Sequence, residues 1–80
     1  MPYIKQERRD ELTELPSPST PGELNYMLTV VCRNYLDSKL LSYQTINDVI
    51  GALEGAKLEF YRRVAAPYED IKIKENGDIF

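Results

Sequence analysis

Tyrosines and basic side chains occur close together near both ends of this sequence. The two sets comprise Lys57, Tyr61, Arg62, Arg63 and Tyr68 on one side, and Tyr3, Lys5, Arg8 and Arg9 on the other. Basic groups hold phosphate oxygens, and a tyrosine ring offers a flat face on which a base stacks. We therefore expect these residues to bind a small anionic, nucleotide-like ligand when two chains bring them together. The alternative is that the tyrosines belong to a core or protein interface and the cations to surface ion pairs.

Lys57 lies within a series of apolar residues that recurs every three or four positions. It falls between Leu53 and Phe60, on the face that an α-helix would give to this series. In one interpretation its stem covers apolar surface while its ammonium group reaches water. In the other it is a fixed cation within a mostly apolar pocket.

Residues suited to catalysis or metal binding are few. The chain has no histidine, the usual general base near neutral pH, and a single cysteine, Cys32. Gly51 and Gly55 fall within a predicted helix rather than in a phosphate-binding loop between a strand and a helix. We therefore expect a protein that is not an enzyme, with no cofactor and no metal site.

The composition restricts the class of partner and the compartment. The chain has 80 residues, enough for one small domain, and a net charge of −3, which disfavours a nucleic-acid partner. One cysteine excludes an internal disulfide and fits a reducing compartment. No signal peptide follows Met1 and no apolar run reaches membrane-spanning length. We expect a cytoplasmic protein without a membrane partner.

The longest periodic segment spans residues 42–66 and predicts an α-helix. Its apolar face comprises Ile46, Val49, Ile50, Leu53, Phe60, Tyr61 and Val64. Ser42 can cap the start, and Pro67 marks the end because proline disfavours the helical conformation in the residue before it. Glu59 can pair with either of the two arginines that follow it.

The opposite face of this helix carries Gly51 and Gly55, together with Leu58. Glycine inside a helix costs about 1 kcal/mol relative to alanine, a loss that close approach of another backbone would offset. The preceding helix has a second, partly apolar line through Tyr26 and Val30, which indicates a further packing partner. We therefore predict a symmetric oligomer, most simply a dimer that forms a four-helix bundle, with these five residues at the interface.

That preceding helix is predicted over residues 21–37. Thr20, Pro21 and Glu23 stand at the N-cap, N1 and N3 positions of a capping box. The connection to the longer helix is short, so the two helices are expected to form an antiparallel hairpin.

Residues 16–21 are rich in proline and serine and predict a stiff, extended linker. A short, highly charged helix is predicted before it, over about residues 5–15.

The tail, residues 67–80, carries conflicting signals. The segment Ile71–Lys74 alternates with period two, and Asn76-Gly77 is typical of a tight hairpin turn, so extended or hairpin structure is favoured. The competing interpretation begins a helix at Pro67 and ends it with Gly77 in the C′ position.

Three stretches resemble a family of short uncharacterised proteins from bacteriophages and bacteria. They are residues 1–9 (MPYIKQERR), residues 21–26 (PGELNY) and residues 43–54 (YQTINDVIGALE) with the sequence that continues through Asn76-Gly77-Asp78. The resemblance implies a phage-associated protein in the cytoplasm of the bacterial host cell and transfers no catalytic residue. Small phage proteins of this size often act by binding, including the sequestration of nucleotide signals of host immunity.

Together these features predict a mainly α, single-domain protein of residues 1–80. It consists of an antiparallel helical hairpin, a short N-terminal helix and a small irregular or β C-terminal tail, packed as a symmetric oligomer. The expected function is non-enzymatic: sequestration of a nucleotide-like immune signal in phage counter-defence. The alternative is an oligomeric scaffold or inhibitor that acts through contacts with a host protein.

Overall fold

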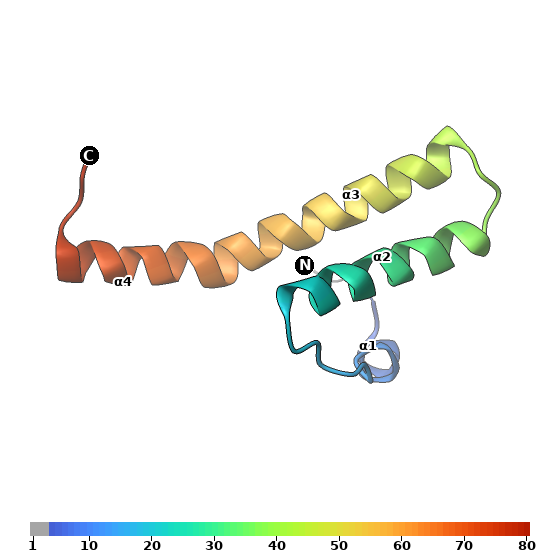
Figure 1. Ribbon diagram of the computed structural model, residues 1–80, viewed down its shortest axis with the longest axis horizontal. Helices are drawn as coiled ribbons and strands as arrows, with labels where there is room; N and C mark the ends of the chain where they lie inside the picture. The colour runs from blue at the N-terminus through green and yellow to red at the C-terminus, as the bar shows by residue number, and fades with distance from the viewer. Residues whose placement is uncertain (1–3) are drawn as a thin grey trace. The chain divides into compact units, whose positions relative to one another are not determined.

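The computed structural model describes residues 4–80, and these residues are mainly helical with no strand among them. The helices in chain order are α1 (Gln6–Leu12), α2 (Pro21–Asp37), α3 (Tyr43–Phe60), a π-helical turn (Tyr61–Ala65) and α4 (Ala66–Asn76) (Figure 1). The predicted mainly α class is therefore confirmed. Tyr3, one of the predicted ligand-binding residues, lies outside the described residues.

The start of α2 follows from the capping pattern in the sequence. The Glu23 backbone N–H donates to Thr20 Oγ1 at 3.1 Å, and the Ser19 N–H donates to Glu23 Oε1 at 3.0 Å. These bonds satisfy backbone donors that have no partner inside the helix. The helix consequently begins at Pro21, as predicted.

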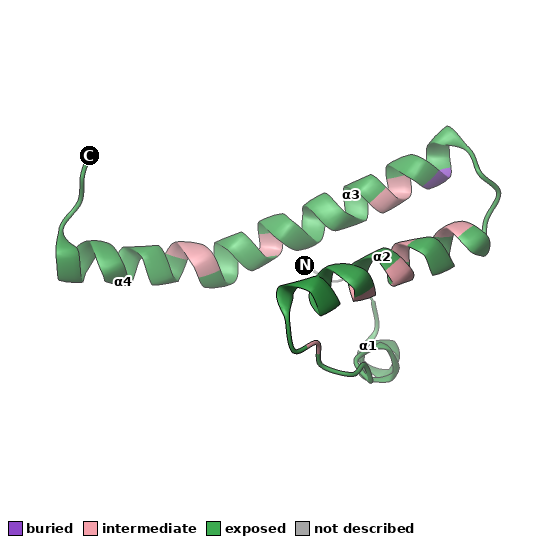
Figure 2. Ribbon diagram, in the orientation of Figure 1, coloured by how far each residue is buried: buried purple, intermediate pink, exposed green. Residues whose placement is uncertain are grey.

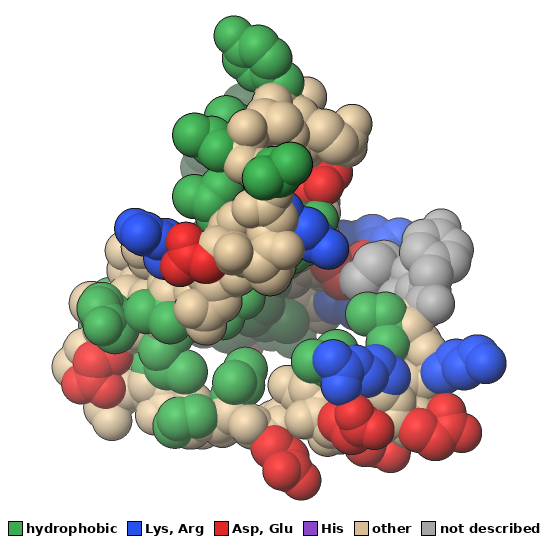
Figure 3. Space-filling view, turned by 90° about the vertical axis from the view of Figure 1, so that its right-hand side faces the viewer, with side chains coloured by type: hydrophobic (Ala, Val, Ile, Leu, Met, Phe, Trp, Pro, Cys, Tyr) green, Lys and Arg blue, Asp and Glu red, His purple; other side chains and the backbone are tan. Residues whose placement is uncertain are grey.

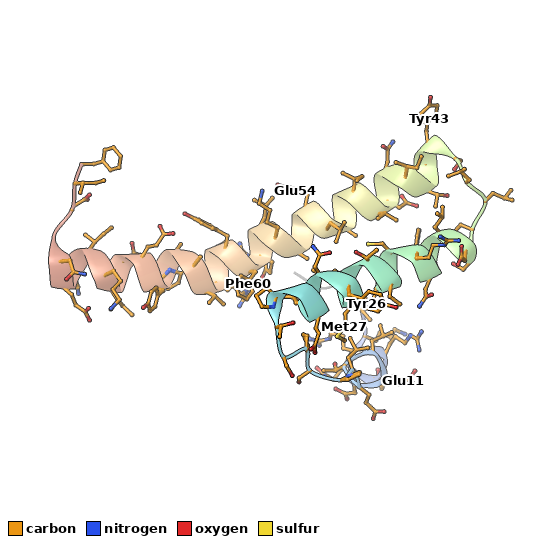
Figure 4. The ribbon with its side chains drawn as sticks, viewed as in Figure 1. Glu11, Tyr26, Met27, Tyr43, Glu54 and Phe60 are labelled. Carbon is orange, nitrogen blue, oxygen red and sulfur yellow. The ribbon has the colours of Figure 1, made fainter. Side chains whose placement is uncertain are left out.

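The chain divides into two compact units, and the first ends at Val31. In this unit the linker does not stand free of α2. Leu15 and the residues that follow it line an apolar groove of about 320 Å³ together with one face of α2; its lining comprises Leu15, Pro16, Ser17, Pro18, Leu24, Met27, Leu28 and Val31. Met27, labelled in Figure 4, is one of the α2 residues of this groove.

The second unit, Cys32–Phe80, begins with the last turns of α2 and a reversal of the chain. Ser42 Oγ accepts from the Thr45 backbone N–H at 3.2 Å, and Thr45 Oγ1 donates to the Leu40 carbonyl oxygen at 2.7 Å. Across the turn, the Tyr35 hydroxyl donates to Asp48 Oδ2 at 2.9 Å, which raises the pKa of Tyr35. The predicted reversal is thus present at its turn, while the antiparallel course of the full helices stays a prediction.

The tail corrects one expectation, because residues 66–76 are helical rather than extended or hairpin. The competing interpretation is the one the structure adopts: Gly77 has a φ of 84° and its N–H donates to the Ile73 carbonyl oxygen at 2.8 Å. The predicted end of the helix at residue 66 is likewise wrong. Helix α3, the π turn and α4 form one continuous helical rod (Figure 1).

The π turn explains how the helix passes Pro67. A proline has no N–H to donate, and its ring collides with the carbonyl group four residues earlier. In the turn before it, the Ala66 N–H donates to the Tyr61 carbonyl oxygen five residues back instead of four. This wider turn gives the ring space, so the helix continues where the sequence predicts a stop.

Burial in the described residues is confined to the chain reversal. Thr45 is 6% exposed and is the one buried residue of positions 4–80, seen as the purple band near the start of α3 in Figure 2. No hydrophobic side chain in this range is buried. Hydrophobic side chains instead lie open on the surface among the charged ones (Figure 3). Among the described helices, none is long and apolar enough to cross a membrane.

Candidate binding surface

The two arginines of the C-terminal set converge on one carboxylate. An Arg62 guanidinium nitrogen lies 2.7 Å from Glu59 Oε2, and Arg63 Nε donates to Glu59 Oε1. The spacings of three and four residues place all three side chains on the same side of the helix, as the sequence predicts. The hydrogen bond from Arg63, with the positive charge of Arg62, lowers the pKa of Glu59 against a smaller opposing effect of burial.

The π turn aligns Tyr61 with Glu69. The Tyr61 hydroxyl lies 3.3 Å from Glu69 Oε2 and 3.4 Å from Oε1. In a regular α-helix, residues eight positions apart are separated by about 80° around the axis, because each residue turns the helix by about 100°. The extra residue in the π turn cancels most of this angle, so the phenol and the carboxylate meet.

Tyr68 and Lys57 have separate neighbours on the same rod. Lys72 Nζ lies over the Tyr68 ring, 5.4 Å from its centroid, at cation–π distance. Lys57 Nζ lies 3.6 Å from Glu54 Oε1, and its side chain is 74% exposed. Glu54 and Phe60 project from the rod in Figure 4. Within one chain, Lys57 therefore has its ammonium group in solvent, and no closed apolar pocket surrounds it.

The described N-terminal candidates, Lys5, Arg8 and Arg9, lie on or beside α1 in the first unit. Lys5 is the N-cap residue, an Arg8 guanidinium nitrogen lies 2.7 Å from Glu11 Oε2, and Arg9 donates to Gln6 Oε1 at 2.7 Å. Their neighbours are thus residues of the same helix. Because the two candidate sets belong to different units, their convergence on one ligand stays a prediction.

The predicted interface residues are open on the single chain. A Cβ atom built on Gly51 or Gly55 would meet nothing within 4 Å. Leu58 and Tyr26 are exposed, and Val30 is half-buried. Within the second unit, Cys32–Phe80, nothing lies close enough to the two glycines to offset their helical cost.

Sequence reasoning missed the π turn and the contact between Tyr61 and Glu69. The signal was Pro67 itself, which follows two alanines in a segment with helical periodicity. A proline within a helix is expected either to end it or to distort the turn before it. The apolar groove beside the linker was also missed, because the composition of the linker predicts stiffness and not a packing partner.

The described residues place charged and aromatic side chains together on exposed faces of the helices. In residues 4–80 no group of three or more His, Cys, Asp or Glu side chains is placed to hold a metal ion. Fold and surface define a small helical protein with open apolar and charged faces. The chain belongs to the family described as "Domain of unknown function (DUF6899)", whose model matches residues 1–79. Comparison with curated proteins and with solved structures finds no match.

The open face at Gly55 leads to a prediction for Gly55→Leu. A Cβ atom at position 55 meets nothing within 4 Å, and leucine favours the helix by about 1 kcal/mol relative to glycine. If the face packs against another copy, the larger side chain is expected to weaken assembly while helicity per folded chain rises. Sedimentation velocity and circular dichroism on the same samples check the two effects. Unchanged assembly with raised helicity would remove this face from the interface.

The lowered pKa of Glu59 leads to a prediction about pH. A carboxylate whose pKa is lower in the folded state contributes stability above its ordinary value near 4.3, and this contribution is lost as the pH falls through the folded-state value. Glu59→Gln is therefore expected to lower the thermal midpoint at pH 7 and to have progressively less effect below about pH 4. The matched control, Glu54→Gln, removes only the 3.6 Å contact with Lys57 and is expected to change the midpoint less. Equal losses at pH 7 and pH 3 would contradict the assigned role of Glu59.

Proposed function

We propose that this protein is a non-enzymatic, oligomeric interaction protein that acts through protein–protein contacts. One observation carries the proposal: residues 4–80 bury no hydrophobic side chain while large apolar side chains are exposed along every helix. Ordering a chain costs about 1.5 kcal/mol per residue, and burial of apolar area is the main term that offsets this cost. A second protein surface would supply the missing burial.

The dimensions of the helical rod support the same conclusion. The rod comprises segments of 18, 5 and 11 residues, about 51 Å at 1.5 Å per residue. A single helix cannot bury its side chains against itself. The other described helices, α1 and α2, have 7 and 17 residues, about 36 Å end to end. They are too short to cover the rod, wherever they lie.

In this proposal the first partner is another copy of the chain, and the finished oligomer acts as a scaffold or as an inhibitor of a host protein. The resemblance to phage and bacterial proteins supports the cytoplasm of a bacterial cell as the setting. The mixture of acidic and basic side chains on all helices fits a protein partner better than a polyanion.

Light scattering over a range of micromolar concentrations tests the proposal. We expect at least twice the mass of one chain, with a thermal midpoint that rises with concentration because association stabilises the folded state. A single-chain mass combined with cooperative, concentration-independent unfolding would overturn it.

A second candidate function is the sequestration of a nucleotide-like ligand. The observation that favours it is the convergence of Arg62 and Arg63 on one carboxylate, with Tyr61 and Tyr68 on the same rod. Guanidinium pairs that hold a carboxylate have the geometry to hold a phosphate. In the single chain Glu59 occupies that position, so it would compete with an anionic ligand.

Calorimetry against cyclic and linear nucleotides and ADP-ribose derivatives tests this candidate. If it is correct, Glu59→Gln binds a ligand of the panel more tightly than the unchanged protein does, and replacing both arginines by methionine abolishes binding. If neither the unchanged protein nor Glu59→Gln binds any ligand more tightly than about 10 μM, roughly −7 kcal/mol, sequestration is excluded.

A further inference from the structure

The order of charges along the second half of the helical rod suits an antiparallel pair. Where one copy has a cation, a second copy running in the opposite direction has an anion. Between positions 57 and 75 the basic residues are Lys57, Arg62, Arg63, Lys72 and Lys74, and the acidic residues are Glu59, Glu69, Asp70 and Glu75. A pair of cations thus lies three to four residues before Ala66, and a pair of anions lies three to four residues after it. All of these positions belong to one continuous helix within the second unit.

We propose that two copies pair antiparallel along residues 57–75, with the two-fold axis of the dimer beside Ala66. In this register Arg62 and Arg63 of one copy lie at the same position along the helix axis, here called the height, as Glu69 and Asp70 of the partner. Lys57 lies at the height of Glu75. Glu59 lies opposite position 73 of the partner, between its Lys72 and Lys74. This inference rests on the proposed function, since it names the partner and the surface of the first contact.

The alternative, a parallel pair in register, would place every charge at the height of the same charge in its partner. Charges act over about 8–10 Å at physiological salt. Because a helix rises only 1.5 Å per residue, charges within a few positions of one another contribute to this interaction. Such surface charges supply little affinity each, but like-charge alignment disfavours an orientation, so the pattern selects the antiparallel one.

The face of the helix that carries Ala66 agrees with this register. Arg62 and Asp70 lie four residues before and after Ala66, so they share its side of the helix and meet the opposite charge of the partner. The residue at the axis is small, since Ala66 stands there with Ala65 before it. Small side chains allow two helices to approach closely.

Charge reversal tests the orientation. One variant carries Arg62→Glu with Arg63→Glu, a second carries Glu69→Arg with Asp70→Arg, and a third carries all four changes. We expect each double variant to raise the dimer dissociation constant about tenfold or more, and the fourfold variant to return it to within about threefold of the unchanged protein.

Comparing the double variants with the fourfold variant distinguishes lost charge pairing from a simple loss of folding. The Glu69/Asp70 variant leaves the contacts between Glu59 and the two arginines intact. The recovery in the fourfold variant cannot come from a damaged helix. A parallel dimer would show no change in either double variant, because like charges face each other before and after the reversal. That outcome, or no recovery in the fourfold variant, overturns the inference.

Distances between spin labels test the register directly. In a Cys32→Ser background, which removes the native thiol, labels are attached through Lys57→Cys or Glu75→Cys, two exposed positions on the rod. Labels at position 57 in both copies should lie about 27 Å apart along the rod, the rise of eighteen residues. Mixing copies labelled at position 57 with copies labelled at position 75 should give a much shorter distance.

Each result has a distinct meaning. Short distances between two position-57 labels indicate a parallel dimer and overturn the inference, while the proposed function stands. Long distances for every combination indicate that the oligomer uses another surface, with the same consequence. A single-chain mass in the scattering experiment overturns the proposed function and the inference together.

Discussion

Replacing Phe60 and Val64 together by serine is expected to dissolve the oligomer and most of its helicity. These side chains are 65% and 50% exposed in the single chain, so an isolated chain would lose little by the change. In an assembly that covers the rod they become buried, and each large apolar side chain then contributes about 1.5 kcal/mol or more. Four such side chains in a dimer amount to about 6 kcal/mol, over ten-thousandfold in the dissociation constant.

Light scattering and circular dichroism across a dilution series measure this effect. The matched control is Leu40→Ser with Tyr43→Ser, which removes two side chains that are each 87% exposed at the chain reversal. We expect the control to keep the mass and helicity of the unchanged protein. If the Phe60/Val64 variant also keeps its mass, the covered surface does not include the face of the rod that carries these two residues.

Replacing Pro67 by alanine is expected to strengthen the helix and weaken the oligomer. Alanine restores a backbone donor and removes the collision that the π turn relieves, which favours the helix by up to about 3 kcal/mol. The turn would then close to a regular α-helical turn and rotate α4 relative to α3 by about 100°. Tyr61 and Glu69 would separate, and the surface presented by α4 would no longer continue that of α3.

Thermal unfolding of dilute samples and sedimentation of concentrated ones separate the two effects. Pro21→Ala serves as the control, because proline at the first position of a helix has no lost hydrogen bond to restore. It is expected to change neither quantity appreciably. If Pro67→Ala raises helix stability and association together, the register created by the π turn has no part in the assembly.

The amount of structure predictable from the sequence differs between the two ends of the rod. At Ser42 one local signal acts alone: its hydroxyl accepts a backbone N–H of the first turn, and the helix begins where predicted. Around Pro67 and Gly77 the local signals conflict, and the prediction that favoured extended or hairpin structure is wrong. Ile71 and Ile73 alternate as a strand would, yet neither residue has a strand partner in positions 4–80. A helix satisfies its backbone bonds within the segment, and this advantage decides the outcome.

The candidate surface shows the same division. The spacing of Glu59, Arg62 and Arg63 determines that they share one side of a helix, and the structure places them in contact. Whether those guanidinium groups stand free for a ligand is not a property of spacing. It depends on which acceptor is nearest in space, and Glu59 fills that position.

The sequence by itself determined the helical class, the start of α2 and α3, the mixed charge and the apolar series along the rod. These follow from bonds and spacings within one or two turns of helix, which need no distant partner. Only the tertiary structure decided that the rod continues through Pro67, that Tyr61 reaches Glu69, and that the linker lines a groove with α2. Each of these depends on the backbone rotation accumulated over several residues or on packing between segments. A pattern of neighbouring residues determines neither of them.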